Sequence, residues 1–506
     1  MKTAILLTTI LLLAVFSSGG TSARSPSSHL YTFSYENVLG TSLDLKIGAT
    51  SLPEAESAEG AVLNEIDREA KILSAWDTDS EFSRWMRTSR EPISISPELF
   101  EVLGLFDKWR ARTGGALDAS AEVITRLWKM AEKQQRLPSS DELSAAVGLV
   151  RQAHWQLDRQ AQTAIHSSRS PLVLSSFTKS YIAGHAADIA LASDGVSSVV
   201  VNIGGDLVVR GDWSEPVDIA DPMADAENGS PIARLTIHDR AIATSGNYRR
   251  GFEIGGRHYS HIVDPRTGMT AEEIVSSTVV ARDPADAGAM ATAFSVLTPS
   301  ESRQVAASIP GVEFLLVMNN GRQVRSSGWG ALEGKAPQIA AGRRLGGGNS
   351  QAWNTSYELV VNVELAQLDG RAQRPYMAVW IEDQDKFPVR TIALWFNKDR
   401  FLPELKVWHH AAQLTSEAGG ADVTHSVSSA TRSAGKYTLK WDGKDDTGKL
   451  VKAGRYTVFI EAVREHGGYV LLHQEMEFYG TPNTIQLKGS TEVANASLEY
   501  RRIKVD

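Results

Sequence analysis

The stretch that decides the fold reads NIGGDLVVRG at 202–211, AIATSGNYRR at 241–250, HYSHIVDPRTG at 258–268 and DAGAMATAFSVL at 286–297. In each segment Gly, Ser, Asp, His or Thr stands beside short apolar runs, where an ordinary core would place Leu or Val. Binding residues concentrate on loops held by a rigid scaffold. The four segments therefore indicate a ligand site built at the ends of strands.

The sequence around this stretch predicts mixed secondary structure. Paired strands are expected over 31–47 and a hairpin over 199–210, and a strand over 314–318. Six further segments are predicted to be helices, with apolar residues at helical spacing in 58–75 and 97–112 and an alanine-rich composition in 285–297. These predicted helices cover 58–75, 97–112, 120–133, 140–152, 285–297 and 300–308. Helices and strands without regular alternation indicate an α+β fold.

The C-terminal third is different in character. A Gly-rich stretch, expected as a linker over 339–350, precedes a series of short strands separated by turn residues. This pattern predicts an all-β antiparallel sandwich over 351–506, with KVWHH at 406–410 as one of its strands. His409 and His410 would then point to opposite faces, which makes them a poor metal pair. The segment at 441–462 resembles the Ig-like module of flagellar hook-capping proteins.

Composition excludes several classes of site. The chain has 506 residues, a formal net charge of −8 and no cysteine. Disulfides, thiolate nucleophiles and Cys-ligated zinc are therefore absent, and the negative charge does not favour nucleic acid. Residues 1–23 have the pattern of a signal peptide, which predicts a periplasmic or exported protein. The apolar run of residues 4–16 is shorter than the roughly 20 residues that span a bilayer, so no integral membrane segment is expected.

Three segments carry the most specific signatures. They read NIGGD at 202–206, TSGNY at 244–248 and HIVDPRTG at 261–268. Taken alone, the first two are typical of turns, because Gly adopts positive φ without strain. A single histidine is also more often structural than catalytic. In this order, however, the segments resemble the ApbE family, bacterial enzymes that take FMN from FAD and attach it to a protein threonine.

The resemblance covers most of residues 35–335 and includes LSAWDTDSE at 73–81 and TGGALD at 113–118. It implies an ApbE-like flavin transferase domain over 24–338, with FAD as a substrate, Mg²⁺ as a cofactor and a protein carrying an acceptor threonine as the partner. His261 is the implied catalytic residue, as a proton shuttle or phosphate donor. The implied flavin-nucleotide contacts are Gly115, Ala116, Leu117, Lys179, Asn202, Gly204, Gly205, Asp206, Ser245 and Gly246.

The chain departs from the family pattern before the NIGGD turn. The family has a segment like DLGGIAKGYAVD, whereas this chain reads VLSSFTKSYIAGHAAD at 173–188. One register aligns Lys179 with the family lysine, and then Val173 replaces an Asp and the Ser176 carbonyl takes a metal-ligand position. The other aligns Gly184–Asp188 with the family's Gly-Tyr-Ala-Val-Asp and loses the lysine. The first is preferred because Lys179 supplies a cation for phosphate.

The second departure concerns the metal. The family ends its site with ADALATAL on a helix, where the Asp and the Thr four residues later both ligate Mg²⁺. Here Thr292 is present, but Gly288 stands at the Asp position. Mg²⁺ prefers carboxylate and phosphate oxygens, so the site is expected to be weakened, and an Asp restored at 288 is expected to strengthen it. Asp286 could substitute only if the helix begins late.

These residues favour an FAD:protein FMN transferase that releases AMP. Two alternatives stay open. An FAD pyrophosphatase would use water in place of the threonine, and a non-catalytic flavin-binding or scaffold protein would have lost the metal chemistry. A further segment at 194–198, DGVSS, resembles the acidic-Gly-x-Ser/Thr acceptor motif of flavinylated proteins. Its apolar continuation predicts a buried turn instead.

Overall fold

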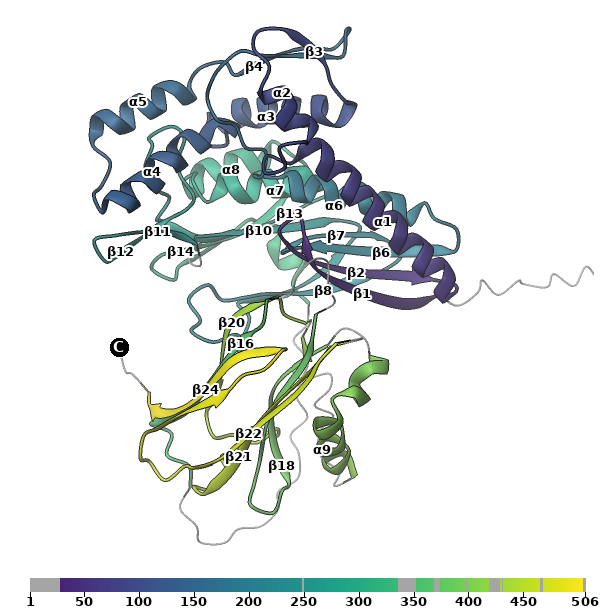
Figure 1. Ribbon diagram of the computed structural model, residues 1–506, viewed down its shortest axis with the longest axis vertical. Coiled ribbons are helices and arrows are strands. Elements are labelled where there is room, and N and C mark those ends of the chain that lie inside the picture. Colours follow the sequence, from purple (N-terminus) through teal and green to yellow (C-terminus); the bar gives the residue numbers. More distant parts are fainter. Residues whose placement is uncertain are drawn as a thin grey trace, which may run out of the picture.

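The computed structural model describes residues 28–247, 250–334, 352–367, 374–396, 399–417, 428–429, 431–464 and 467–503. The expected signal peptide at 1–23 and the expected linker at 339–350 lie outside these residues. The described chain forms two lobes with separate hydrophobic cores (Figure 1). The larger core draws on residues 33–324 and the smaller on residues 353–500.

An antiparallel sheet of eight strands forms the base of the N-terminal lobe. Its strands, in spatial order, are β1 (His29–Val38), β2 (Thr41–Ala49), β6 (Val196–Ile203), β7 (Asp206–Gly211), β10 (Ala241–Gly246), β13 (Ile274–Ala281), β14 (Glu313–Met318) and β15 (Gln323–Arg325). One face packs against α1 (Leu52–Leu73), α6 (Thr178–Leu191) and α7 (Pro284–Phe294). A second apolar cluster that includes Val209 and Trp329 covers the opposite face.

The remaining helices surround this layer. They are α2 (Glu81–Met86), α3 (Pro97–Arg112), α4 (Glu122–Gln134), α5 (Ser140–Val150) and α8 (Pro299–Ala307). All six predicted helices are found, each within a few residues of its expected bounds apart from α1, which begins earlier. Ser139 and Thr298 begin α5 and α8 with complete capping boxes. Two helices, α2 and α6, were not predicted.

Three small sheets complete the described part of the lobe. β3 (Pro92–Ser94), β5 (Thr163–His166) and β4 (Trp155–Asp158) form a three-stranded sheet. β8 (Ser214–Ile219) pairs with β9 (Ala233–His238), and β11 (Gly251–Ile254) pairs with β12 (Arg257–Ser260). The β11–β12 hairpin leads directly into the segment that carries His261.

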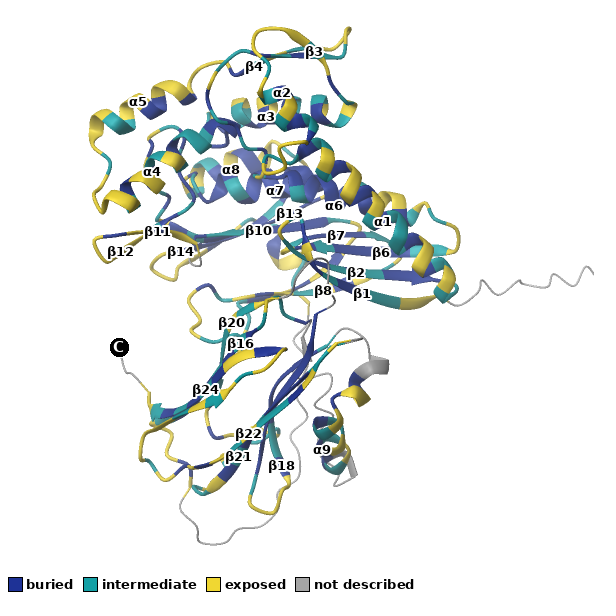
Figure 2. Cartoon of the chain, in the orientation of Figure 1, coloured by how far each residue is buried: buried dark blue, intermediate teal, exposed yellow. Residues whose placement is uncertain are grey.

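Helices α6 and α7 approach each other unusually closely because each contributes a glycine to their contact. A Cβ atom added to Gly184 on α6 would lie 2.9 Å from the Pro284 ring, and one added to Gly288 on α7 would lie 2.3 Å from the Ser180 hydroxyl. Figure 2 shows α7 dark along its length, and Thr292 is its one residue outside the buried class. The close packing sets the geometry of the candidate site.

The C-terminal lobe is a sandwich of two sheets, as predicted. One sheet orders β20 (Gly435–Trp441), β16 (Tyr357–Leu365), β24 (Val493–Arg502) and β23 (Asn483–Lys488). The other orders β19 (Ser428–Ser429), β18 (Pro388–Trp395), β17 (Tyr376–Glu382), β21 (Arg455–Val463) and β22 (Tyr469–Glu477). All pairings are antiparallel except β18 with β19. Trp353, Trp441 and Phe478 pack together in the core between the sheets.

The expectation of a strand at 406–410 is wrong. These residues begin the helix α9 (Lys406–Glu417), which packs Trp408 and Ala411 against the outer face of β17 and β18. The carboxylate of Glu461 accepts hydrogen bonds from the backbone N–H groups of Val407 and Trp408 and so satisfies the start of the helix. His409 and His410 are therefore helical neighbours and not residues on opposite faces of a strand.

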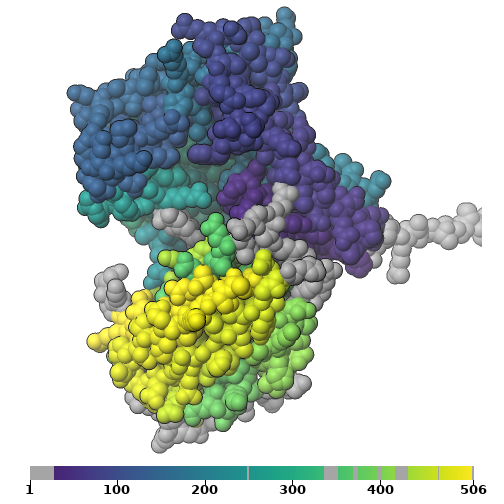
Figure 3. All heavy atoms as spheres, viewed as in Figure 1, coloured from purple at the N-terminus to yellow at the C-terminus, as the bar shows by residue number. Residues whose placement is uncertain are grey.

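The two lobes lie against each other (Figure 3). Among the described residues, polar contacts join them at two places. The backbone N–H of Glu227 donates to the Thr438 carbonyl at 2.7 Å, and Asn228 exchanges two hydrogen bonds with the backbone of Lys440, so the loop before β9 pairs with the edge strand β20. The buried guanidinium of Arg374 forms ion pairs with Glu36 at 2.8 Å and Asp44 at 2.9 Å, on β1 and β2. Among the described helices, none has the length and apolar character needed to cross a membrane.

Candidate functional site

The NIGGD segment forms the turn between β6 and β7. Gly204 and Gly205 have φ angles of +61° and +100°, which favour glycine. A side chain at 204 would also collide with Thr41. Asn202 closes the turn, because its side-chain oxygen accepts from the backbone N–H of Gly205 at 3.0 Å. Both glycines are exposed, so their backbone can approach a ligand closely.

Ser245 and Gly246 end β10, which lies beside β7. The register pairs Ile242 with Leu207 in antiparallel fashion, so the strand continues past the start of β7 toward the Gly204–Gly205 turn. The two segments therefore lie at one edge of the sheet. Tyr248, the last residue of the TSGNY segment, lies outside the described residues.

Helix α6 begins beside the same turn. The Ser180 hydroxyl donates to Asp206 Oδ2 at 2.9 Å, and Lys179 Nζ lies 4.0 Å from that oxygen. Burial raises the pKa of Asp206, while Lys179 and Ser180 act in the opposite direction. Lys179 is the cation beside this carboxylate, and its ammonium is exposed enough to contact a phosphate as well.

Thr292 on α7 reaches the chain just before α6. Its hydroxyl donates to the main-chain carbonyl of Ser176 at 2.9 Å. That carbonyl precedes the helix, which begins at Thr178. In the alternative register the corresponding carbonyl would belong to Ser180, which lies inside α6 where backbone carbonyls bond within the helix. The contact therefore favours the register that aligns Lys179.

Asp286 does not face this contact. Helix α7 begins at Pro284, with Asp283 as its N-cap, so the late start that Asp286 would need is not found. The Asp286 carboxylate pairs with Lys108 on α3 at 3.3 Å, whereas Gly288 faces Ser180 on α6. Burial and the neighbouring Asp283 raise the pKa of Asp286. The two positions belong to different faces of α7.

The TGGALD turn follows α3. Gly115 has a φ of +86°, and Leu117 N–H donates to the Thr113 hydroxyl at 3.1 Å. Ala116 and Leu117 are buried. Asp118 caps the next turn through Ser120 N–H and forms an ion pair with Arg110 at 2.8 Å. Asp118 therefore fixes the loop and is not itself free for a ligand.

His261 is held in one tautomer. Its Nδ1 lies 3.1 Å from the Arg250 carbonyl, and a carbonyl only accepts, so Nδ1 carries the proton and Nε2 has a free lone pair. Burial lowers the pKa of His261, with a smaller opposing effect from the bond to Arg250. The ring is therefore neutral near pH 7 and can accept a proton through Nε2.

The HIVDPRTG turn that follows is rigid. Asp264 accepts from the backbone N–H of Arg266 at 2.8 Å and pairs with its guanidinium at 3.0 Å. Trp128 donates to the Gly268 carbonyl at 2.9 Å. Asp264 thus pins the turn.

A cleft of about 780 Å³ opens beside this turn. It is lined by Lys108, Ala111, Arg112, Thr113, Gly114, Arg266, Leu297, Glu301, Gln304, Val305 and Ser308. Three basic side chains in this set give the cleft a cationic wall. It touches the TGGALD and HIVDPRTG segments, but Lys179, Asp206 and Thr292 are not in its lining. The sequence did not single out its α8 residues, because no motif marks them.

Two models of protein families match different parts of the chain. A family model described as the ApbE family matches residues 39–316, more than half of the chain. The chain belongs to the ApbE family. A second model, described as a predicted periplasmic protein (DUF2271), matches residues 358–495 and covers the sandwich.

Relatives support the assignment. An FAD:protein FMN transferase of Klebsiella pneumoniae (strain 342) is 28% identical over 302 residues, which are 58% of this chain and 86% of that protein. The Escherichia coli (strain K12) protein of the same description is 28% identical over 269 residues, 50% of this chain and 76% of its own. The crystal structure of the ApbE protein from Thermotoga maritima superposes with a TM-score of 0.54 at 25% identity, over 61% of this chain and 100% of that one.

The departures of this ApbE chain from its family pattern are spatially linked. In the register that aligns Lys179, the family pattern expected from the sequence has Gly at the position of Ser180 and Asp at the position of Gly288. A Cβ at 288 would lie 2.3 Å from Ser180 Oγ and 3.0 Å from Ser180 Cβ. The larger residue on α6 therefore occupies the space that the larger residue on α7 would need. The two changes form one exchange across the α6–α7 contact.

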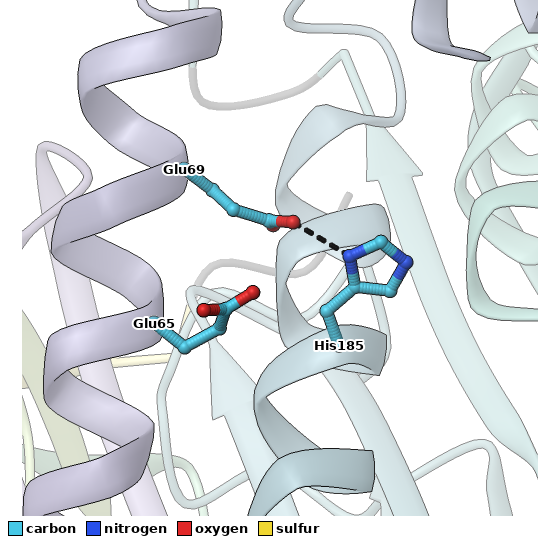
Figure 4. A group of neighbouring side chains, drawn as sticks. All are labelled: Glu65, Glu69 and His185. Atoms are coloured by element: carbon cyan, nitrogen blue, oxygen red, sulfur yellow. Dashed lines mark hydrogen bonds and ion pairs between the residues drawn. The ribbon is translucent and has the colours of Figure 1, made fainter. Parts of the chain in front are cut away.

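A separate polar cluster lies between α1 and α6 (Figure 4). His185 Nδ1 lies 2.6 Å from Oε1 of the fully buried Glu69, and Glu65 points toward both residues. The bond to Glu69 raises the pKa of His185. The guanidinium of Arg68 donates hydrogen bonds to both carboxylate oxygens of Glu65, at 2.7 and 2.8 Å. The sequence analysis missed this cluster, although Glu65 and Glu69 have the spacing of neighbours on one helix face.

Proposed function

We propose that this protein is an FAD:protein FMN transferase that moves FMN from FAD to a threonine of a partner protein in a Mg²⁺-dependent reaction with release of AMP. The observation that carries the proposal is the contact of Thr292 with the Ser176 carbonyl, beside Lys179 and the Gly204–Gly205 turn. It gathers hydroxyl, carbonyl, ammonium and backbone N–H groups where a pyrophosphate needs them. The naming of the relatives as FAD:protein FMN transferases supports it.

The donor set fits a hard divalent cation. Ser176 contributes a carbonyl oxygen and Thr292 a hydroxyl oxygen, 2.9 Å apart, and Mg²⁺ is bound by few protein oxygens together with substrate phosphates. These two residues would hold the ion. Bound there, it would offset the negative charge of the pyrophosphate.

The chain's own residues account for binding and proton transfer. Lys179 pairs with a phosphate oxygen, and Gly204, Gly205 and Ser245 offer donors from the sheet edge. Nε2 of His261 accepts the proton of the acceptor threonine hydroxyl. The threonine oxygen then bonds to the FMN phosphorus, the bond from that phosphorus to the bridging oxygen breaks, and AMP departs with the bridging oxygen. Gly115, Ala116 and Leu117 line the flavin side of the site.

The domain plan and location belong to the same proposal. In this proposal a signal peptide at 1–23 precedes the transferase domain of residues 24–338. Residues 339–350 are the linker, and residues 351–506 form the sandwich. The match of residues 358–495 to a family described as a predicted periplasmic protein supports a periplasmic or exported location.

Gly288 favours a second candidate, a flavin-binding protein without catalysis, because the carboxylate of the family pattern is missing from α7. A third, FAD pyrophosphatase, differs only in the use of water. The test is AMP release from FAD, measured with Mg²⁺ and with EDTA, and with or without a peptide that carries an acidic-Gly-x-Thr acceptor. Transfer requires AMP release that depends on both Mg²⁺ and peptide. AMP release without peptide indicates hydrolysis, and no AMP release indicates binding alone.

A further inference from the structure

Asp206 is a partly buried carboxylate that contacts Lys179 and Ser180 in the first turn of α6. Its side chain is 15% exposed. The residue begins β7, immediately after the Gly204–Gly205 turn. Oδ2 accepts from Ser180 at 2.9 Å and lies 4.0 Å from Lys179 Nζ. A carboxylate offers about four acceptor positions, so these two partners leave room for a further cation.

The same Ser180 hydroxyl connects Asp206 to position 288. A Cβ built on Gly288 would lie 2.3 Å from Ser180 Oγ, the atom that donates to Asp206. Positions 288 and 292 are four apart on α7, so their side-chain directions are neighbours at about 5–6 Å. The Asp206 carboxylate therefore lies one hydrogen bond away from the space that a side chain at 288 would enter, and Thr292 is the neighbour of that position on α7.

We propose that Asp206 supplies the carboxylate ligand of the divalent cation held by Ser176 and Thr292. The ligand has moved from helix α7 to the turn between β6 and β7, and Ser180 orients it from the space freed by Gly288. The inference rests on the metal dependence in the proposed function and adds a residue to that site. A carboxylate is the ligand type that Mg²⁺ and Mn²⁺ prefer over a hydroxyl or a carbonyl.

The geometry disfavours the rival carboxylate. Asp286 lies on α7, but it pairs with Lys108 on α3 at 3.3 Å, and its backbone N–H is bound by the N-cap Asp283. Its partner lies on α3, whereas Gly288 faces Ser180 on α6. Asp286 therefore serves as the matched control, because it is a buried carboxylate with its own lysine partner, on the helix that carries Thr292.

The experiment measures Mn²⁺ binding to the full chain by electron paramagnetic resonance, with Mg²⁺ as the competitor and without FAD. Asp206→Asn should weaken Mn²⁺ binding by at least about tenfold, the smallest loss typical even of residues that only support a ligand. Thr292→Val should weaken the same class of site. Asp286→Asn should leave the affinity within about twofold. Thermal melting of each variant shows that the fold persists.

A rescue keeps the test sharp if Asp206→Asn disturbs its surroundings. In that background the pair Ser180→Gly and Gly288→Asp returns a carboxylate to α7, removes the Ser180 hydroxyl that blocks it, and should restore Mn²⁺ affinity. The proposal is overturned if the natural chain binds no Mn²⁺, if Asp206→Asn binds as the natural chain does, or if Asp286→Asn causes the loss. Because the readout is metal affinity, Mn²⁺ binding without AMP release contradicts the transferase and leaves the assignment of Asp206 standing.

Discussion

The Thr292 hydroxyl donates a 2.9 Å hydrogen bond to the Ser176 carbonyl and so joins α7 to the segment that precedes α6. The bond is possible because Gly184 and Gly288 let the two helices pack without Cβ atoms at their closest points. Thr292 is the one α7 residue outside the buried class. Helix α7 therefore presents one hydroxyl to the segment that leads into α6, while its carboxylate Asp286 pairs with Lys108 on α3.

Substitution of His261 should remove activity and keep the fold. His261→Ala deletes the Nε2 lone pair that accepts the threonine proton, and we expect AMP release to fall by about 10²–10⁴-fold, the usual contribution of a general base. The ring makes one hydrogen bond, to the Arg250 carbonyl, so stability should fall by only about 1 kcal/mol. Turnover and melting are the measurements. Unchanged turnover would exclude His261 from catalysis.

The rate should be insensitive to mild acid. The lowered pKa of His261 means that Nε2 stays unprotonated until the pH falls below the ordinary histidine value of about 6.5. We expect the acid limb of kcat/KM for FAD-dependent AMP release to lie below that pH and to disappear in the residual activity of His261→Gln. An acid limb above pH 6.5 that follows His261 would contradict the tautomer and its burial.

The single substitution Gly288→Asp should destabilise the fold and should not strengthen the metal site. The sequence predicts a stronger metal site, but a Cβ there would lie 2.3 Å from Ser180 Oγ and 3.2 Å from Phe177 Cβ. Overpacking of this kind costs about 1–3 kcal/mol, so Gly288→Asp should unfold at lower urea concentration. Ser180→Gly with Gly288→Asp should recover most of that loss, less the cost of a helical glycine, about 1 kcal/mol. Equal stability of the single and double variants would show that the clash is not the cause.

The cluster at α1 and α6 should make stability depend on pH. The bond to Glu69 raises the pKa of His185, so the stabilisation is complete below the unfolded value of about 6.5 and is lost as the pH rises through the folded pKa. Glu65, Arg68, Glu101 and Tyr181 surround the pair.

Urea unfolding of the natural chain and of His185→Gln at pH 6 and pH 8.5 measures the effect. The gap in unfolding free energy between the two proteins should be larger at pH 6. A gap that widens at pH 8.5 would mean that His185 is neutral in the folded protein.

Removal of the Arg374 side chain should weaken the coupling between the unfolding of the two lobes. Its side chain is 3% exposed and pairs with Glu36 and Asp44, and burial raises the pKa of Glu36. Arg374→Ala leaves a buried carboxylate without its cation, which costs about 3–5 kcal/mol. Calorimetry should show the two lobes melting further apart in temperature. Asp225→Ala, which removes the exposed partner of Lys440 at the other contact, should shift melting much less.

Periodicity predicted most elements of the fold, since α1, α3, α4, α5 and α8 each carry an apolar face, and the alanine-rich composition predicted α7. The prediction was wrong at α9, because the segment KVWHH alone does not include the apolar residues Ala411 and Ala412, which complete a helical face. It also missed α6, because this helix is buried on nearly all sides and its small residues show no strong periodicity.

Among the candidate site residues, Thr292 and Ser176 were singled out from the sequence, but their contact depends on packing between α6 and α7. The same is true of the relation between Ser180 and Gly288. These residues are 108 positions apart, and no local pattern shows that one fills the space of the other. Whether a motif residue faces its neighbour is set by tertiary structure, as the separation of Asp286 from Gly288 shows.

The most direct test of the account is the intact mass of an acceptor peptide. A peptide with an acidic-Gly-x-Thr motif is incubated with the full chain, FAD and Mg²⁺, beside a control peptide with Ala in place of Thr. The account predicts that the threonine peptide alone gains the mass of one phosphoester-linked FMN, with one AMP released for each FMN attached. AMP formed without any gain in peptide mass, or no reaction of FAD at all, would contradict it.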